Sequence, residues 1–235
     1  MLRLEALSRH FGGVKAVDRL ELTVQEGEIC GLIGPNGSGK TTTINVVTGV
    51  LRPTAGRVYF RDREITGRRS DVVLRHGIGR TFQNIRLFGS LEVWKNLWVA
   101  QTSRGNRREI EDILHFYALW DKRDVLASQL SFGEQRRLEL ARAQATGAVL
   151  LLLDEPAAGM SADELENLRR SILSLRDRGK TILLVDHVME LVMNVADRLA
   201  VLNFGVKIAE GTPAEMQRHP AVQEAYLGVA EGMAP

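Results

Sequence analysis

The spacing of apolar residues predicts an α/β chain in which strands and helices alternate. Leu20, Leu22 and Val24 alternate with polar residues, which is the period-two pattern of a half-buried strand. The run "EICGLIG" is short and continuously apolar, so it predicts a buried strand, followed by a glycine-rich loop and a helix to about Thr48. Because "GRVYFRDREIT" predicts another strand and turn, the first eighty or so residues are expected to be strand-rich.

The apolar spacing becomes helical between Asn84 and Gly147. "SLEVWKNLWVAQ" and "REIEDILHFYAL" both place their large apolar residues mostly on one helical face. We therefore predict an α-helical subdomain over 84–147, inserted into a core formed by 1–83 and 148–235. The elements expected after it are a strand at 149–153, a helix at about 162–177, a strand at 181–186, a helix at 188–196 and a hairpin at 199–209. This order predicts a mostly parallel sheet flanked by helices.

Composition narrows the class of protein. The chain has 235 residues, of which 44% are apolar and 26% charged, as in ordinary globular proteins. A net charge of +2 gives no argument for a nucleic-acid partner, so none is expected. The one cysteine, Cys30, lies in an apolar run and is expected to be buried.

The apolar run "AVLLLL" is too short to span a bilayer and no signal segment is visible, so we expect a cytoplasmic protein. The arginine-rich stretches 61–70 and 103–109 are expected to be solvated faces.

A phosphate-binding loop is the clearest motif. "GPNGSGKT" fits G-x-x-x-x-G-K-[ST], with a predicted strand before it and a predicted helix after it. The glycines allow backbone conformations that aim successive N–H groups at a phosphate. Lys40 is expected to reach the β- and γ-phosphates, and the Thr41 hydroxyl to bind Mg²⁺. The residues predicted to hold the nucleotide here are Gly34, Pro35, Asn36, Gly37, Ser38, Gly39, Lys40, Thr41 and Thr42.

Five further residues suit hydrolysis of a nucleotide. Asp154 ends the apolar run of "LLLLDE" and is predicted to hold Mg²⁺, with Glu155 as the general base for water; a surface acid pair is the alternative. Gln83 is predicted to ligate Mg²⁺ and orient the water, and His187 to face the same pocket, unless it is structural. Phe11 is predicted to stack on a nucleotide base, unless it lies in the core.

A second anion site is suggested by "LSFGEQ". Ser131 can cap a helix there, and Glu134 follows at the spacing of a capping box. The N–H groups of such a helix start, including that of Gly133, attract anions.

Taken together, these motifs resemble the nucleotide-binding subunit of an ABC transporter. "GPNGSGKTT" resembles Walker A, "LLLLDE" resembles Walker B with a catalytic Glu155, and "LSFGEQ" resembles the LSGGQ signature. Gln83, His187 and Phe11 match the Q-loop, the H-loop and the aromatic A-loop. The resemblance implies a P-loop NTPase (RecA-like) core with an N-terminal antiparallel β subdomain and the inserted helical subdomain.

The resemblance also implies that two such subunits, alike or different, meet head to tail around two ATP molecules. The signature of one subunit, here Ser131, Gly133 and Glu134, then binds the γ-phosphate held by its partner. Phe132 and Glu134 depart from the LSGGQ motif, and Ser161 stands where the D-loop usually has an aspartate.

Three stretches give a finer resemblance. "RTFQNIRLFGSLEVWKNLWVAQ", "DEPAAGM" and "HPAVQEAYLG" are similar to the ATP-binding subunits of branched-chain amino-acid importers and their relatives for amides and urea. This resemblance implies integral membrane permease partners, a periplasmic or extracellular substrate-binding protein, and a place on the cytoplasmic face of the cell membrane. The alternatives are a lipopolysaccharide-export ATPase and a soluble ABC ATPase of DNA repair or translation. A P-loop GTPase would need an N-K-x-D motif, and no Asn-Lys pair occurs.

Overall fold

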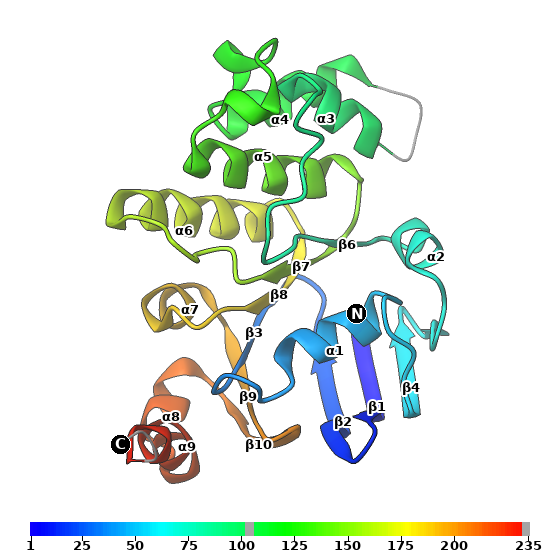
Figure 1. Ribbon diagram of the computed structural model, residues 1–235, viewed down its shortest axis with the longest axis vertical. Coiled ribbons are helices and arrows are strands. Elements are labelled where there is room, and N and C mark those ends of the chain that lie inside the picture. Colours follow the sequence, from blue (N-terminus) through cyan, green and yellow to red (C-terminus); the bar gives the residue numbers. More distant parts are fainter. Residues whose placement is uncertain (102–105, 232–235) are drawn as a thin grey trace.

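The strands form two sheets in the computed structural model, which describes residues 1–101 and 106–231 (Figure 1). An antiparallel sheet of order β2-β1-β4-β5 contains β1 (Leu2–Phe11), β2 (Val14–Val24), β4 (Ala55–Phe60) and β5 (Arg63–Glu64). The second sheet has the order β10-β9-β3-β8-β7-β6 and contains β3 (Ile29–Ile33), β6 (Ile78–Arg80), β7 (Leu150–Asp154), β8 (Thr181–Val185), β9 (Arg198–Asn203) and β10 (Val206–Gly211). Its neighbouring strands are parallel except β9 and β10. The predicted mostly parallel sheet and the predicted N-terminal antiparallel sheet are confirmed.

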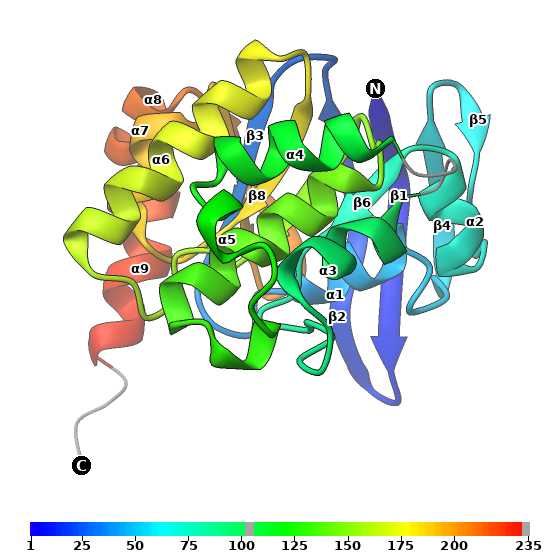
Figure 2. The same cartoon turned by 90° about the horizontal axis from the view of Figure 1, so that it is seen from above.

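The predicted helices are present close to their predicted positions. The helices are α1 (Lys40–Val47), α2 (Ser70–Arg75), α3 (Val93–Ala100), α4 (Arg107–Phe116), α5 (Phe132–Ala145), α6 (Ala162–Asp177), α7 (Met189–Val195), α8 (Pro213–Arg218) and α9 (Pro220–Glu231), with 3₁₀ turns at Trp120–Lys122 and Ala127–Gln129. Of these, α2, α8 and α9 are additional helices that the sequence patterns did not predict. Figures 1 and 2 show α3, α4 and α5 gathered beside α6. The arginine-rich stretch 103–109 lies partly outside the described residues. Within 1–101 and 106–231, no helix has the length and apolar character needed to cross a membrane.

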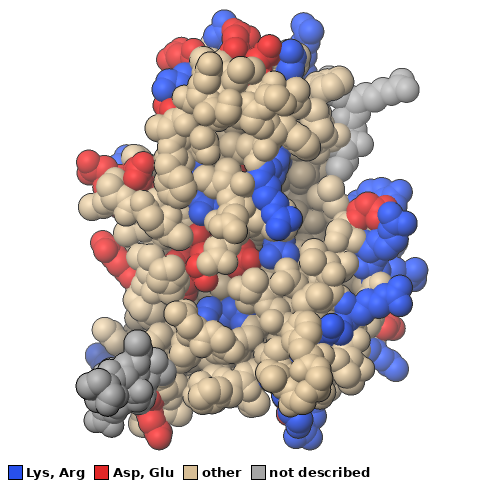
Figure 3. Space-filling model, viewed as in Figure 1, with Lys and Arg blue, Asp and Glu red and all other residues tan. Residues whose placement is uncertain are grey.

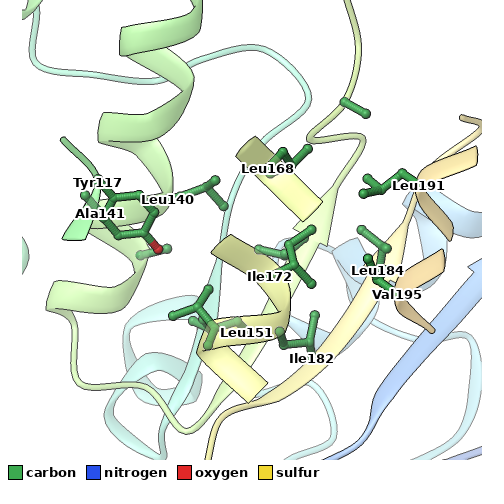
Figure 4. Packing of buried hydrophobic residues seen from close by; sticks show 14 of the residues in the cluster. Tyr117, Leu140, Ala141, Leu151, Leu168, Ile172, Ile182, Leu184, Leu191 and Val195 are labelled. Atoms are coloured by element: carbon green, nitrogen blue, oxygen red, sulfur yellow. The ribbon is translucent and has the colours of Figure 1, made fainter. Parts of the chain in front are cut away.

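The six-stranded sheet is covered on both faces, because alternate residues of each strand point to opposite sides. On β3, Ile29 and Ile33 join a core with α3 to α7, whereas Cys30 and Leu32 join a core with α1 and the antiparallel sheet. Figure 4 shows the first core, where Leu151 and other sheet residues meet side chains of α6 and α7. Consequently α1 and α5 pack against opposite faces of the sheet. Cys30 is buried, as predicted, and this burial raises the pKa of its thiol to about 12.

Candidate functional site

The predicted site residues follow strands that run in the same direction. The loops after β3, β6 and β8 carry residues 34–39, 81–83 and 186–187 respectively, while Asp154 ends β7 and Glu155 follows it. Because these strands are parallel neighbours, their carboxyl ends lie along one edge of the sheet, where ligands of open α/β sheets bind. Acidic side chains gather in the middle of the molecular face seen in Figure 3, with basic side chains above and below them.

The phosphate loop depends on two glycines with positive φ. Gly39 has a φ of 106° and directly precedes α1, and a Cβ there would lie 2.3 Å from the Ala16 carbonyl oxygen. Gly34 has a φ of 149°, and its Cβ would lie 2.1 Å from the Leu202 carbonyl oxygen. Only glycine fits both the dihedral angles and the space. The loop is thus held between β2 and β9, and α1 begins directly after it.

Lys40 is folded across this loop. Its Nζ donates hydrogen bonds to the carbonyl oxygens of Gly34 and Pro35 at 2.8 and 2.9 Å, and the residue is 6% exposed. Burial lowers the pKa of Lys40, while the charges of Glu155 and Asp154 oppose that shift. The ammonium group therefore lies within electrostatic reach of both carboxylates.

The rest of the loop offers both buried and exposed groups. Ser38 is buried, whereas Asn36 and Gly37 are exposed. Thr41 and Thr42 are half-buried in the first turn of α1. Free N–H groups and hydroxyls at a helix start suit an anion.

Asp154 is buried and pairs with a residue that the sequence patterns did not single out. Its Oδ2 accepts a hydrogen bond from the Arg80 guanidinium at 2.9 Å, and its Oδ1 has no partner among the described residues. Burial raises the pKa of Asp154, and the nearby Arg80 opposes this shift.

This arrangement fits a magnesium ion. The unpartnered Oδ1 of Asp154 and the hydroxyl of Thr41 are oxygen donors of the kind that Mg²⁺ prefers. The described residues contain no group of three or more histidine, cysteine or acidic ligands. An ion held here would therefore complete its coordination with water and phosphate oxygens, as Mg²⁺ commonly does.

Two of the other predicted site residues lie against the carboxylate of Glu155. The Gln83 amide donates a hydrogen bond to Glu155 Oε2 at 2.8 Å, and His187 Nδ1 lies 3.5 Å from the same oxygen. Glu155 has a φ of 49°, in the left-handed region that costs a non-glycine residue free energy and often marks functional sites. Three residues from three different loops thus meet at one carboxylate.

Phe11 lies at the end of β1 with 43% of its surface exposed, so the alternative that it belongs to the core is wrong. The guanidinium of Arg9 lies 4.4 Å from the centre of its ring.

The start of α5 is the predicted capping box. Ser131 Oγ accepts the Glu134 N–H at 3.4 Å, and Glu134 Oε2 accepts the Ser131 N–H at 2.9 Å. The carboxylate of Glu134 also pairs with Lys122, so that side chain is engaged within the chain. No hydrogen bond among the described residues joins Ser131 or Gly133 to the phosphate loop, since α5 and α1 lie on opposite faces of the sheet.

Gly133 is covered by the start of α6. A Cβ at Gly133 would lie 2.0 Å from Glu164 Oε1, and Glu164 itself closes a second capping box with Ser161. Phe132 extends over the same region, with its ring 3.6 Å from where a Cβ of Gly159 would be. The start of α5 and the segment that leads into α6 therefore lie against each other within one chain.

Several residues at the site were missed by the sequence patterns. Arg80 precedes "TFQ" at the end of β6, and only its charge next to an apolar strand was a signal. Glu164 had a clearer one, because Ser161 and Glu164 have capping-box spacing. Tyr226 of α9 lines one pocket with Ile33, the residue directly before the phosphate loop, a proximity over a sequence separation that no local pattern reveals.

Comparisons with known proteins agree with this geometry. The family model described as "ABC transporter" matches residues 17–158, and the model described as "Branched-chain amino acid ATP-binding cassette transporter" matches residues 206–232. The chain is similar to the high-affinity branched-chain amino acid transport ATP-binding protein LivG of Salmonella typhimurium, with 41% identity over 98% of both chains. It is also similar to the corresponding protein BraF of Pseudomonas aeruginosa, with 38% identity over 98% of both chains.

A solved structure has the same fold along nearly the whole chain. An ATP-binding cassette of an ABC transporter in its ADP conformation has a TM-score of 0.88 and 32% identity, and the match covers 97% of this chain and 98% of that one. A match over more than half of the chain by the family model, and relatives of this identity over full length, establish the family. The chain belongs to the ATP-binding cassette subunits of the ABC transporter family and is an ATPase of that fold.

Proposed function

We propose that this chain hydrolyses ATP to power an importer of branched-chain amino acids or related amides. The observation that carries the proposal is the full-length similarity to LivG and BraF, together with the separate match at residues 206–232. The latter region forms β10, α8 and α9, and Tyr226 of α9 lines a pocket with Ile33, which directly precedes the phosphate loop.

We assign the steps of hydrolysis to residues of the site. The loop from Gly34 to Thr42 holds the phosphates, with Lys40 neutralising the β- and γ-oxygens. The Thr41 hydroxyl, Asp154 and Gln83 would hold Mg²⁺, and the ion would offset charge on the transferring phosphoryl group.

Water activation is assigned to the cluster at Glu155. Its carboxylate accepts a proton from the water that attacks the γ-phosphorus. Gln83 and His187 fix the orientation of that carboxylate, since both lie against Oε2. Phe11 stacks on the adenine through its exposed ring.

The signature residues are assigned to a second nucleotide. Ser131 directly precedes α5 and Gly133 lies in its first turn, and α5 packs on the face of the sheet opposite to α1, the helix that follows the phosphate loop. We propose that they, with the backbone of Glu134, bind the γ-phosphate on the loop of a partner ATPase subunit. A dimeric ATP-binding cassette with 25% identity and a TM-score of 0.80 is known in a post-hydrolysis state bound to ADP and phosphate.

The permease is proposed to dock beside α3. A groove of about 540 Å³ lies between the helices of 84–147, which we treat as the helical subdomain, and the core. Val50, Phe88 and Val99 line it and are 47–53% exposed, and Arg86 and Arg142 flank it. Exposed apolar side chains in a groove suit an amphipathic helix. We propose that a cytoplasmic helix of the permease binds here, which places the chain on the cytoplasmic face of the membrane and connects it to an extracytoplasmic binding protein.

Reconstitution tests the proposal. The chain is co-purified with the products of neighbouring genes, the complex is placed in liposomes, and uptake of labelled leucine, a short amide and urea is measured with ATP inside and outside. ATP-dependent leucine or amide uptake that disappears in Glu155→Gln is expected. Uptake of urea alone, or ATP-driven movement of a lipid-linked substrate outwards, would contradict the assigned substrate while retaining the ATPase.

A further inference from the structure

A buried ion pair lies in the second turn of the signature helix. Arg136 and Glu139 are each 1% exposed, and the guanidinium donates a hydrogen bond to the carboxylate at 2.8 Å. Both are on α5, which begins directly after Ser131. Burial raises the pKa of Glu139, and the charge of Arg136 opposes the shift.

Both members of the pair reach out of α5 to the segment after β6. Arg136 donates hydrogen bonds to the carbonyl oxygens of Phe82 and Gln83, each at 3.0 Å. Glu139 Oε1 accepts the N–H of Phe82 at 3.2 Å. Three backbone groups of two consecutive residues are therefore held by one ion pair, in a segment that has no helix or strand of its own.

Packing alone does not explain two buried charges. Apolar side chains of similar volume often stabilise such a position as well as, or better than, an ion pair, because charges must be desolvated. A guanidinium beside a carboxylate does offer fixed donor and acceptor positions, which can fix an irregular backbone in one geometry. The pair thus specifies where Phe82 and Gln83 lie relative to α5.

The held segment leads directly to the catalytic cluster. The Gln83 side chain donates to Glu155 Oε2 at 2.8 Å, and it belongs to the same residue whose backbone carbonyl accepts from Arg136. Along the helix, Ser131 and Arg136 are about 7–8 Å apart in axial rise. The single helix α5 therefore has the signature at its start and binds the Gln83 backbone one to two turns later.

We propose that Arg136 and Glu139 are positioning residues that make the placement of Gln83 depend on the position of the signature helix. The inference rests on the proposed function, in which Gln83 serves the nucleotide of its own chain and Ser131 that of the partner subunit. Movement of α5 onto the partner's phosphate then shifts Gln83 against Glu155. The ion pair links the two ATP sites of the dimer, in a chain whose D-loop has Ser161 in place of the usual aspartate.

The experiment uses the complete transporter complex and two variants of this chain. Arg136→Met with Glu139→Leu removes both buried charges together and so preserves folding, while the backbone contacts are lost. Arg136→Lys keeps the charge but loses the two-pronged contact with the Phe82 and Gln83 carbonyls. Arg137→Met is the matched control, because Arg137 is the next residue of the same helix and is bonded to Tyr117 instead.

Two sets of measurements are made. ATP binding is measured on the isolated chain, and kcat, KM and the Hill coefficient of hydrolysis are measured on the complex. ATP binding to the isolated chain is expected to stay unchanged, because the phosphate loop is untouched. In the double variant, kcat is expected to fall roughly ten- to a hundredfold, as small misplacements of catalytic groups do. The Hill coefficient is expected to be above unity in the unmodified complex and in Arg137→Met, to fall to unity in the double variant, and to fall part of the way in Arg136→Lys.

Two results would overturn the inference. One is an unmodified Hill coefficient and kcat in both variants, with their folding verified by thermal unfolding. The other is hydrolysis by the unmodified complex without cooperativity. A complex that does not hydrolyse ATP at all would count against the proposed function instead.

Discussion

Replacing Arg80 with alanine is expected to lower the free energy of unfolding of the nucleotide-free chain by about 3–5 kcal/mol, the usual cost of stranding one member of a buried ion pair. Arg80 and Asp154 have side chains only 9% and 1% exposed, so solvent screens their interaction little. The guanidinium also donates to Asn45 Oδ1 at 2.7 Å and to Thr48 Oγ1 at 3.2 Å. Without Arg80, both carboxylate oxygens of Asp154 lack a partner, because Oδ1 already has none among the described residues.

Urea denaturation of a double-mutant cycle measures this effect. Asp154→Asn removes the stranded charge, so Arg80→Ala combined with Asp154→Asn is expected to be clearly more stable than the sum of the single losses predicts. Arg75→Ala is the control, because the Arg75–Asp71 pair is 67% and 53% exposed and should contribute less than about 1 kcal/mol. Millimolar Mg²⁺ is expected to restore part of the stability of Arg80→Ala, since a cation next to Asp154 replaces the lost charge. Additive losses in the cycle, within about 0.5 kcal/mol, would refute the idea that Arg80 compensates Asp154.

Four further outcomes are expected. Glu155→Gln should bind ATP normally by calorimetry but lose hydrolysis in a phosphate-release assay, because an amide does not accept the proton of water; normal turnover would exclude Glu155 as the base. Ser131→Arg should leave ATP binding to the isolated chain intact and block ATP-driven dimerisation in light scattering, whereas Ser131→Ala should lose only about 0.5–2 kcal/mol of stability. Phe11→Ala should weaken ATP and GTP binding alike by roughly 1–3 kcal/mol, and unchanged affinity would argue against stacking. With its pKa raised to about 12, the Cys30 thiol should resist alkylation at pH 8 in the native chain and react once urea unfolds it, so rapid native labelling would contradict its burial.

Local sequence patterns predicted much of the fold, because apolar spacing and helix caps depend only on residues within one segment. The helix at Ala162–Asp177 was predicted with its observed bounds, since its apolar spacing and its cap at Ser161 lie within the segment itself. Strand β1 was not delimited, because its buried residues Leu2, Leu4 and Leu7 break the period of two. A register shift between Leu4 and Leu7 and a positive φ at Ala6 account for the break.

The functional site was also predicted only in part from the sequence. Lys40 and its loop are contiguous, so sequence alone located them. The contacts between Gln83 and Glu155 and between Arg80 and Asp154 join residues 72 and 74 positions apart. Their chemistry is set by the order of strands in the sheet, which hydrophobic periodicity does not encode. The roles that motif resemblance assigned to Gln83, His187 and Ser131 remain predictions until the variants are measured.

The position of β3 in its sheet has a consequence for biosynthesis. Within the described part of the chain, the strand that leads into the phosphate loop pairs only with β8 and β9, and the first of these begins at Thr181. At about 5–20 residues per second, a ribosome needs roughly 8–30 s to make the chain between them. During that interval both edges of the apolar strand Ile29–Ile33 have no partner strand, although the antiparallel sheet of β1, β2, β4 and β5 can already form. We expect nascent chains that stop before β8 to recruit chaperones or aggregate, and the nucleotide site to mature only after almost the whole chain has left the ribosome.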